Sequence, residues 1–371
     1  MINAYWLPFL ATAFACVVIV ITRRWHIRFS ADPTVGVQKF HTKQTPRIGG
    51  LAIMTGLFVS WLWAPTNVSA ILDSMLIASI PAFCFGLLED ITKNIGVFAR
   101  LLATMGSGLF AWYLTGFSMQ NTGIAQVDWA LQWLPLAVLL TAFAVGGVAN
   151  AINIIDGFNG LASGSVAIMA GAIGLIALDV GDPTLASVCA VVVACAVGFG
   201  SVNWPMGRIF LGDGGAYLLG FCLAWLAVLL PMRNPTLNAW TTILVCAYPV
   251  LEVGFSVHRK TKRQGSSPGT PDKVHLHMLV HRRIVRPALP GISKTMQNSM
   301  TSPFCWVVTL LPVLWAIRFA MDTTMLQLGF GLAIFGYAAL YARLTQFRWC
   351  FSALTLRSRP LSSMALQGSK R

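Results

Sequence analysis

Long apolar stretches recur along almost the whole sequence, and they decide what kind of protein this chain can be. A helix needs about 20 apolar residues to cross the hydrocarbon core of a bilayer. About eleven stretches close to that length alternate with polar connections, a pattern typical of membrane proteins and not of soluble domains. They lie at 5–22, 48–63, 71–88, 101–116, 131–152, 161–178, 185–204, 215–232, 239–257, 304–321 and 327–344. The sequence therefore predicts an all-α, polytopic integral membrane helix bundle of about eleven transmembrane helices.

The distribution of charge predicts the orientation of this bundle. Only 10% of the residues are charged, yet the net charge is +14. If the spans alternate in direction, every Lys and Arg except Arg233 and Arg318 falls on one side of the membrane. The positive-inside rule makes that side cytoplasmic, with the N-terminus outside and the C-terminus in the cytoplasm. Contact with anionic lipids accounts for the basic charge, so we expect no nucleic-acid partner.

The connections divide the chain simply. We expect residues 1–344 to form a single transmembrane domain with one large cytoplasmic loop at 258–303, followed by a basic cytoplasmic tail at 345–371. Within the loop, DKVHLHMLVHRRIV reads as a short amphipathic helix that would place His275 and His277 on different faces.

Acidic residues are rare in this chain, so the position of each one is informative. Of the 12, five lie at or near the predicted inner end of a span: Glu89, Asp90, Asp156, Asp213 and Glu252. One such carboxylate would be an ordinary helix cap, but five at one membrane face indicate a site. Carboxylates beside basic loops are typical of phosphoryl transfer, in which Mg²⁺ takes few protein ligands and Lys or Arg neutralises the phosphates.

The segment NAINIIDGFNGLASG, residues 150–164, concentrates polar residues where a span ends. Asn150, Asn153 and Asp156 would share a helix face about 120° wide. The glycines that follow let the backbone turn. Since polar groups without partners cost several kcal/mol in hydrocarbon, we expect this face to end the helix at the membrane surface and not to face lipid.

Several stretches, taken in chain order, resemble one family, the polyprenyl-phosphate N-acetylhexosamine-1-phosphate transferases of glycosyltransferase family 4. The family includes enzymes that start O-antigen and common-antigen synthesis and the translocase that makes the first lipid intermediate of peptidoglycan. The resemblance is carried by HTKQTPRIGGLAI (41–53), GLLEDITK (86–93), NAINIIDGFNGLASG (150–164), FLGDGGAYLLG (210–220) and DKVHLHMLVHRR (272–283).

The resemblance implies a reaction and a set of site residues. The phosphate of undecaprenyl phosphate would attack the β-phosphorus of a UDP-N-acetylhexosamine, giving undecaprenyl-diphospho-sugar and UMP and initiating the synthesis of O-antigen or another envelope polysaccharide. Catalytic roles would fall to Asp90, Glu89 and Asp156. Mg²⁺, with Mn²⁺ as an alternative, would be held by Asp213, Asn153 and Asp156. Phosphates and nucleotide would be bound by Lys93, Asn159, His275, His277 and Arg282.

The same resemblance implies a location. A long polyprenyl lipid cannot leave the bilayer and a UDP-sugar cannot enter it, so the two would meet at the cytoplasmic face of the bacterial inner (plasma) membrane. The expected partners are the UDP-sugar, undecaprenyl phosphate and membrane lipids, and a homodimer is left open.

Three positions depart from the family pattern: Glu89 replaces an Asp, Asn159 replaces a second acid, and Met278 stands where relatives often have His. A catalytically inactive relative that binds lipid phosphate is therefore an alternative. A multi-span secondary transporter is the alternative from another class, although transporters place their sites near the membrane midplane. The sugar is left open among GlcNAc, FucNAc and QuiNAc.

Overall fold

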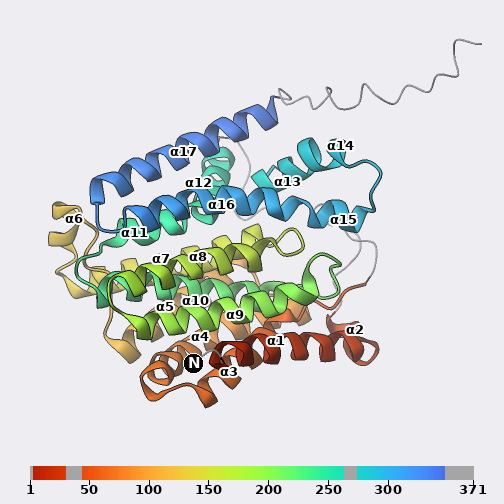
Figure 1. Ribbon diagram of the computed structural model, residues 1–371, viewed down its shortest axis with the longest axis horizontal. Helices are drawn as coiled ribbons and strands as arrows, with labels where there is room; N and C mark the ends of the chain where they lie inside the picture. The colour runs from red at the N-terminus through yellow and green to blue at the C-terminus, as the bar shows by residue number, and fades with distance from the viewer. Residues whose placement is uncertain (1–2, 31–43, 263–273, 347–371) are drawn as a thin grey trace, which may run out of the picture.

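The protein is a bundle of helices, as expected (Figure 1). The computed structural model describes residues 3–30, 44–262 and 274–346, and within these ranges the chain forms helices and loops but no β-strand. The helices are α1 (Asn3–Ile21), α2 (Arg23–Ser30), α3 (Gly49–Trp63), α4 (Thr66–Thr92), α5 (Val97–Thr115), α6 (Ala125–Ala130), α7 (Leu134–Ile155), α8 (Leu161–Asp179), α9 (Pro183–Asn203), α10 (Gly212–Arg233), α11 (Ala239–Val245), α12 (Ala247–Lys262), α13 (Leu276–Val280), α14 (Arg286–Ala288), α15 (Lys294–Ser299), α16 (Thr301–Arg318) and α17 (Thr323–Thr345), with a π-helical turn at His281–Val285. The predicted tail lies almost wholly outside the described residues, as does the middle of the predicted large loop.

Every predicted apolar stretch is helical, but fewer than predicted qualify as full crossings. Among the described residues, nine helices are long and apolar enough to span a membrane, and a bent pair brings the number to ten. The exception is α3, which has 15 residues. It ends at Ala64, whose extended backbone is the conformation favoured before a proline.

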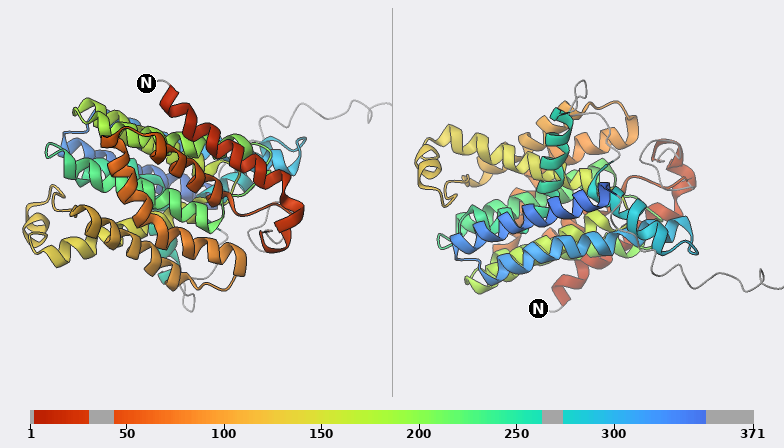
Figure 2. Two further views of the ribbon diagram at one scale, coloured as in Figure 1. Left: turned by 90° about the horizontal axis from the view of Figure 1, so that it is seen from below. Right: turned by 90° about the horizontal axis from the view of Figure 1, so that it is seen from above.

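The predicted span 239–257 is interrupted. It consists of α11 and α12, which meet at an angle of 78°. The right-hand view of Figure 2 shows α12, in teal, running across the direction of the other long helices. Pro249 explains the break, because it has no N–H to donate to the preceding turn and its ring crowds the carbonyl there.

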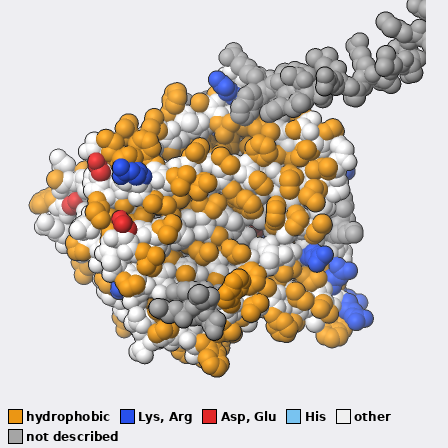
Figure 3. Space-filling view, viewed as in Figure 1, with side chains coloured by type: hydrophobic (Ala, Val, Ile, Leu, Met, Phe, Trp, Pro, Cys, Tyr) orange, Lys and Arg blue, Asp and Glu red, His pale blue; other side chains and the backbone are white. Residues whose placement is uncertain are grey.

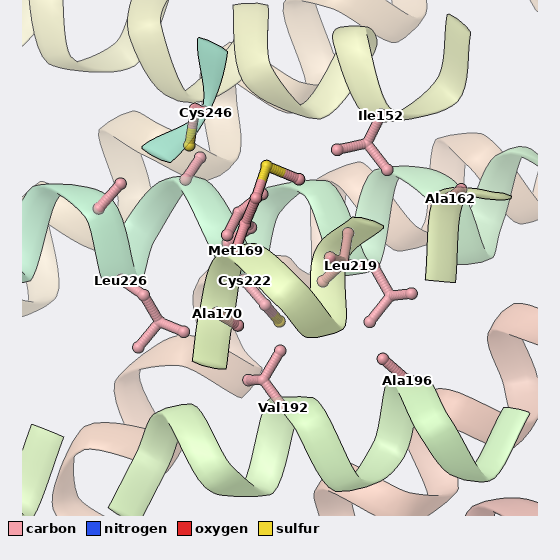
Figure 4. Packing of buried hydrophobic residues seen from close by; sticks show 14 of the residues in the cluster. Ile152, Ala162, Met169, Ala170, Val192, Ala196, Leu219, Cys222, Leu226 and Cys246 are labelled. Carbon is pink, nitrogen blue, oxygen red and sulfur yellow. The ribbon is translucent and has the colours of Figure 1, made fainter. Parts of the chain in front are cut away.

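The central helix of the bundle is α10. In its most apolar stretch of 18 residues, 94% are buried inside the protein. The helices α3, α4, α7, α8 and α9 all pack against it. Figure 4 shows its Leu219, Cys222 and Leu226 among buried side chains of α7, α8 and α9. An all-apolar helix in a membrane is stable against lipid as well as against protein, so the central position of α10 is set by its contacts with the surrounding helices.

Glycines bring two neighbouring helices into backbone contact with the start of α10. A Cβ added to Gly86 of α4 would lie 2.7 Å from the carbonyl carbon of Asp213. One added to Gly50 of α3 would lie 2.4 Å from the backbone nitrogen of Gly215. A real Cβ does not come this close to another heavy atom, so these glycines allow the C-terminal end of α4 and the start of α3 to contact the first turn of α10.

The surface is that of a membrane protein. In Figure 3 apolar side chains cover the flank, whereas charged side chains gather towards the two ends, with basic ones clustered near α2. That helix exposes Trp25 and Phe29 next to its arginines. An apolar band between polar ends matches the hydrocarbon core and interfaces of a bilayer.

Candidate active site

The carboxylate of Asp90 caps the start of α10. Its two oxygens accept hydrogen bonds from the backbone N–H groups of Asp213 and Gly214, both at 2.8 Å, and the side chain is fully buried. The first N–H groups of a helix have no partner within the helix and carry its positive dipole end, so a carboxylate stabilises them. Asp90 thereby fixes the backbone that carries Asp213. We call the end of the bundle where they meet the site end.

Two arginines converge on this pair of aspartates. Arg47 Nε lies 3.1 Å from Asp90 Oδ1, and the same guanidinium donates to Asp213 Oδ1. Arg100 donates to Asp213 Oδ2. The side-chain amide of Asn153 also donates to Asp213 Oδ1, at 3.1 Å. Asp213 is therefore the centre of the cluster, in which two positive charges balance two negative ones.

Backbone hydrogen bonds position Arg47. Its own N–H donates to the carbonyl of Ser30 at 2.7 Å, and the Pro46 carbonyl accepts from the N–H of Phe210 at 2.8 Å. The N–H of Gly49 returns a bond to the Phe210 carbonyl at 3.0 Å. The segment before α3 thus runs beside the segment that leads into α10, which explains why Arg47 reaches Asp213.

Neither arginine was among the predicted site residues. Arg47 lies in the stretch HTKQTPRIGGLAI, one of those that carry the resemblance, and Arg100 lies in the helix that follows Asp90; neither was assigned a role in the site. They could have been found from the sequence because each lies close along the chain to one of the motifs: Arg47 is within the first motif, and Arg100 follows Asp90 by ten residues.

The residues beside Asp90 shape the loop after α4. The Glu89 carboxylate accepts from the N–H of Ile95 at 2.7 Å. Lys93 ends α4 in a left-handed conformation with a φ of 59°, and its ammonium group donates to the Asp90 carbonyl. Both residues lie at the site end. Their roles towards a substrate stay predictions.

The polar face predicted for the end of α7 is only partly shared with the site. Asn153 contacts Asp213, and Asp156 forms the C-cap of α7 one turn later. Asn150 instead donates to Thr104 of α5 at 2.9 Å, so it serves helix packing. The face therefore contributes one direct contact to the aspartate–arginine cluster.

Asn159 lies buried in the turn after α7 and is tied to another part of the chain. Its amide donates to Ser299 Oγ at 3.0 Å and to the Pro205 carbonyl at 3.4 Å. Its backbone N–H donates to the Asn298 side chain at 2.9 Å. These bonds anchor the turn against α15 and the loop before α10. The predicted phosphate contact of Asn159 stays a prediction.

The histidine segment differs from the predicted helix because α13 begins only at Leu276. His275 precedes the helix, so its ring stacks on His277 with centroids 5.4 Å apart and an angle of 5° instead of facing away from it. A Cβ added to Gly157 would lie 3.1 Å from His277 Nε2. The histidine segment therefore abuts the turn that follows Asp156.

The positive charge of this segment comes from its arginines. Burial lowers the pKa of His277 to about 4. Burial, with the nearby charge of Arg286, also lowers the pKa of His281 to about 4. Both imidazoles are thus neutral at pH 7. Arg282, whose Nε donates to the Met278 carbonyl at 3.1 Å, supplies charge for the predicted phosphate contact.

The predicted metal ligands fit Mg²⁺ in chemical type. Mg²⁺ prefers oxygen ligands, uses one or two carboxylates and retains several waters, and Asp213, Asn153 and Asp156 offer such oxygens at the site end. No group of three or more His, Cys, Asp or Glu side chains within the described ranges forms a ready-made metal centre. In this structure the Asp213 oxygens are engaged by arginines and by Asn153.

Comparison of the sequence with known proteins supports the family resemblance. Residues 72–231, from α4 to α10, match the family model described as glycosyl transferase family 4. A relative from Yersinia pestis, named undecaprenyl-phosphate alpha-N-acetylglucosaminyl 1-phosphate transferase, is 25% identical over 274 residues, which are 72% of this chain and 74% of the relative. One from Bacillus subtilis (strain 168), named probable undecaprenyl-phosphate N-acetylglucosaminyl 1-phosphate transferase, is 28% identical over 266 residues, 70% of this chain and 72% of the relative. The matched region includes Asp90, Asn153 and Asp213, and these similarities support the predicted resemblance to glycosyl transferase family 4.

Proposed function

We propose that this protein transfers a sugar 1-phosphate from a UDP-N-acetylhexosamine to undecaprenyl phosphate, forming undecaprenyl-diphospho-sugar and UMP. The names of its relatives support the lipid acceptor and favour N-acetylglucosamine as the sugar. The observation that carries the proposal is the cluster at the site end, where Arg47 and Arg100 converge on Asp90 and Asp213. Such a cluster offers groups for both a cation and a diphosphate.

The arginines give the site its phosphate-binding capacity. Guanidinium groups bind phosphate oxygens through paired, charge-assisted hydrogen bonds. We propose that Arg47 and Arg100 exchange the aspartates for phosphate oxygens when the nucleotide binds. Mg²⁺, or Mn²⁺ in its place, would neutralise charge on the diphosphate, held by Asp213 with Asn153 and Asp156. The exchange would pair the arginines with phosphate oxygens and leave Asp213 to bind the cation.

The chemistry then depends mainly on position. Phosphoryl transfer is accelerated by alignment of the reacting groups and by electrostatic stabilisation more than by proton transfer. The second pKa of a phosphate monoester is about 6, so the lipid phosphate is mostly ionised at neutral pH and needs no general base. Asp90 would therefore act by holding the start of α10, with which it shares two hydrogen bonds.

We also propose that the site faces the cytoplasm from the inner membrane, with the N-terminus outside. The basic side chains near α2 support this orientation, because positive charge is enriched on the cytoplasmic side. A site at the end of the bundle also suits a lipid from the bilayer and a nucleotide from water. A transporter site would lie near the midplane instead.

The test is release of UMP by the purified protein with undecaprenyl phosphate, Mg²⁺ and a panel of UDP-sugars. We expect UDP-GlcNAc to be a substrate, and Asp213→Asn to lower turnover at least about 100-fold. Asp179→Asn is the control, because it makes the same chemical change at an exposed position. Asp179 is the last residue of α8, at the end of that helix away from the site, so turnover should stay unchanged. The absence of UMP with every sugar would overturn the proposal, and retained binding of lipid phosphate would then indicate an inactive relative.

A further inference from the structure

Glu252 is a buried carboxylate that the proposed reaction leaves without a role. It lies on α12, shortly after the break that separates this helix from α11, and only 1% of its surface is exposed. A carboxylate removed from water is costly unless hydrogen bonds compensate for it. Its partners therefore indicate what it is for.

Those partners belong to the histidine segment. Glu252 Oε1 lies 2.9 Å from His275 Nδ1 and accepts a hydrogen bond from the Leu276 N–H, also at 2.9 Å. A carboxylate only accepts hydrogen bonds, so the proton of His275 is held on Nδ1. The other ring nitrogen, Nε2, is thereby left for a different ligand. It accepts in the neutral imidazole and donates in the imidazolium.

His275 is also the member of this group that a ligand can reach. It retains 6% exposure, whereas His277 is completely buried beneath it. The His277 Nδ1 lies 3.9 Å from Glu252 Oε2, and neither of its ring nitrogens has a hydrogen-bond partner among the described residues. The stacked pair reaches the turn at Gly157, next to Asp156. Glu252 is thus connected through two rings to the site.

We propose that Glu252 is a positioning residue that holds the proton of His275 on Nδ1 and so directs Nε2 to a phosphate of the substrates. This inference rests on the proposed function. An outer carboxylate partner that fixes the tautomer and the ring orientation of a working histidine is a recurrent device in enzymes. Here it also secures the start of α13 through Leu276, so orientation of the ring and docking of the segment depend on one side chain.

Among the residues that the structure describes, Glu252 also interacts with Tyr248 on the same helix, Cys305 on α16 and Tyr337 on α17, all buried. With ordinary pKa values above 8, none of these side chain types carries positive charge or gains one near neutral pH. The two histidine rings are therefore the groups whose orientation depends on the carboxylate.

The decisive comparison is between two substitutions of this residue. Glu252→Gln keeps the size of the side chain but offers the imidazole an amide, so the proton is no longer confined to Nδ1. Glu252→Asp keeps the carboxylate on a shorter stem. We expect the kcat for UMP release to fall about 10–100-fold in the Gln variant and less in the Asp variant, with KM for the UDP-sugar changing less than kcat. A purely structural role predicts the reverse order, because Gln is the closer match in shape.

A double-mutant cycle provides a further readout. Glu252→Gln should add little to the loss caused by His275→Ala if it acts through that ring. Tyr337→Phe removes a hydroxyl from the same cluster and is the matched control. Its kcat should stay within about twofold of the wild type.

Several outcomes would overturn the inference. These are a Gln variant with wild-type kcat, an Asp variant slower than the Gln variant, or losses that multiply with His275→Ala. If the Gln variant does not fold, the same cycle is run with Glu252→Asp, and multiplying losses again refute the role. A wild-type protein that releases no UMP refutes the proposed function itself, which keeps the two failures distinguishable.

Discussion

Replacing Asp90 by Asn tests whether a buried carboxylate holds the start of α10. The substitution retains the shape of the side chain but removes its charge and one acceptor oxygen. In the structure the carboxylate receives the backbone N–H groups of Asp213 and Gly214 at 2.8 Å and Arg47 Nε at 3.1 Å. An amide can present its oxygen to only one of the two backbone donors. The other then faces an NH₂ group.

The size of the effect follows from these contacts. A hydrogen bond to a charged group contributes about 1.5–3 kcal/mol, and leaving a buried donor without a partner costs about 1–3 kcal/mol. Weakening the Arg47 contact and losing one backbone contact should lower the free energy of unfolding by about 3–5 kcal/mol. Turnover should fall at least about 100-fold, because a displacement of Asp213 by about 1 Å is enough to misalign the reacting groups.

Two measurements on the purified protein decide the matter: unfolding in detergent and release of UMP. Asp73→Asn is the matched control, since it makes the same chemical change on α4 at an exposed position at the far end of the helix. We expect the control to behave as wild type in both assays. A loss of unfolding free energy below about 1 kcal/mol for Asp90→Asn would refute the proposed cap on α10.

Three further predictions address other contacts. Arg100→Ala leaves Asp213 with one guanidinium partner, and we expect a fall in kcat/KM for the UDP-sugar of at least about 10-fold, measured by UMP release. Gly86→Ala would bring a methyl group to 2.7 Å from the backbone of Asp213, so thermal unfolding should show a loss of about 2 kcal/mol or more. Burial alone would raise the pKa of Asp182, but hydrogen bonds from the Arg233 side chain and the Leu185 N–H hold it below its usual value. The stabilisation is therefore complete above about pH 4, the unfolded value, and lost as the pH falls through the lower folded pKa. Asp182→Asn should thus lower the unfolding free energy by about 2 kcal/mol at pH 7, and the difference from wild type should shrink in acid.

The sequence was sufficient for the class of fold because membrane crossing depends on a local property. A run of apolar residues of the right length forms a helix wherever it lies in the chain. The same logic located Asp90 and Asp213, since a carboxylate at the end of an apolar helix is conspicuous. Both the bend before α12 and the shortness of α3 had local signals as well, in Pro249 and in the proline that follows Ala64.

The parts that escaped prediction depend on contacts between distant residues. Arg47 and Asp213 are neighbours only because the segment before α3 pairs with the segment before α10 through backbone hydrogen bonds. The stacking of His275 on His277 required knowing that α13 begins only at Leu276, after His275, and not at the predicted start near Asp272. The partners of Asn159 likewise come from α15 and the loop before α10. Local patterns carry no information on such pairings.

The enclosure of α10 has a consequence for how this protein responds to its membrane. Bilayers of different thickness act on a protein through the helices that contact lipid, which tilt or shift to reduce the mismatch. Within the described bundle α10 is screened by other helices along its whole length, and it carries Asp213 at its first turn. The site is therefore positioned by a helix that does not contact lipid. A change in acyl-chain length should alter the delivery of the lipid substrate more than the geometry of the site.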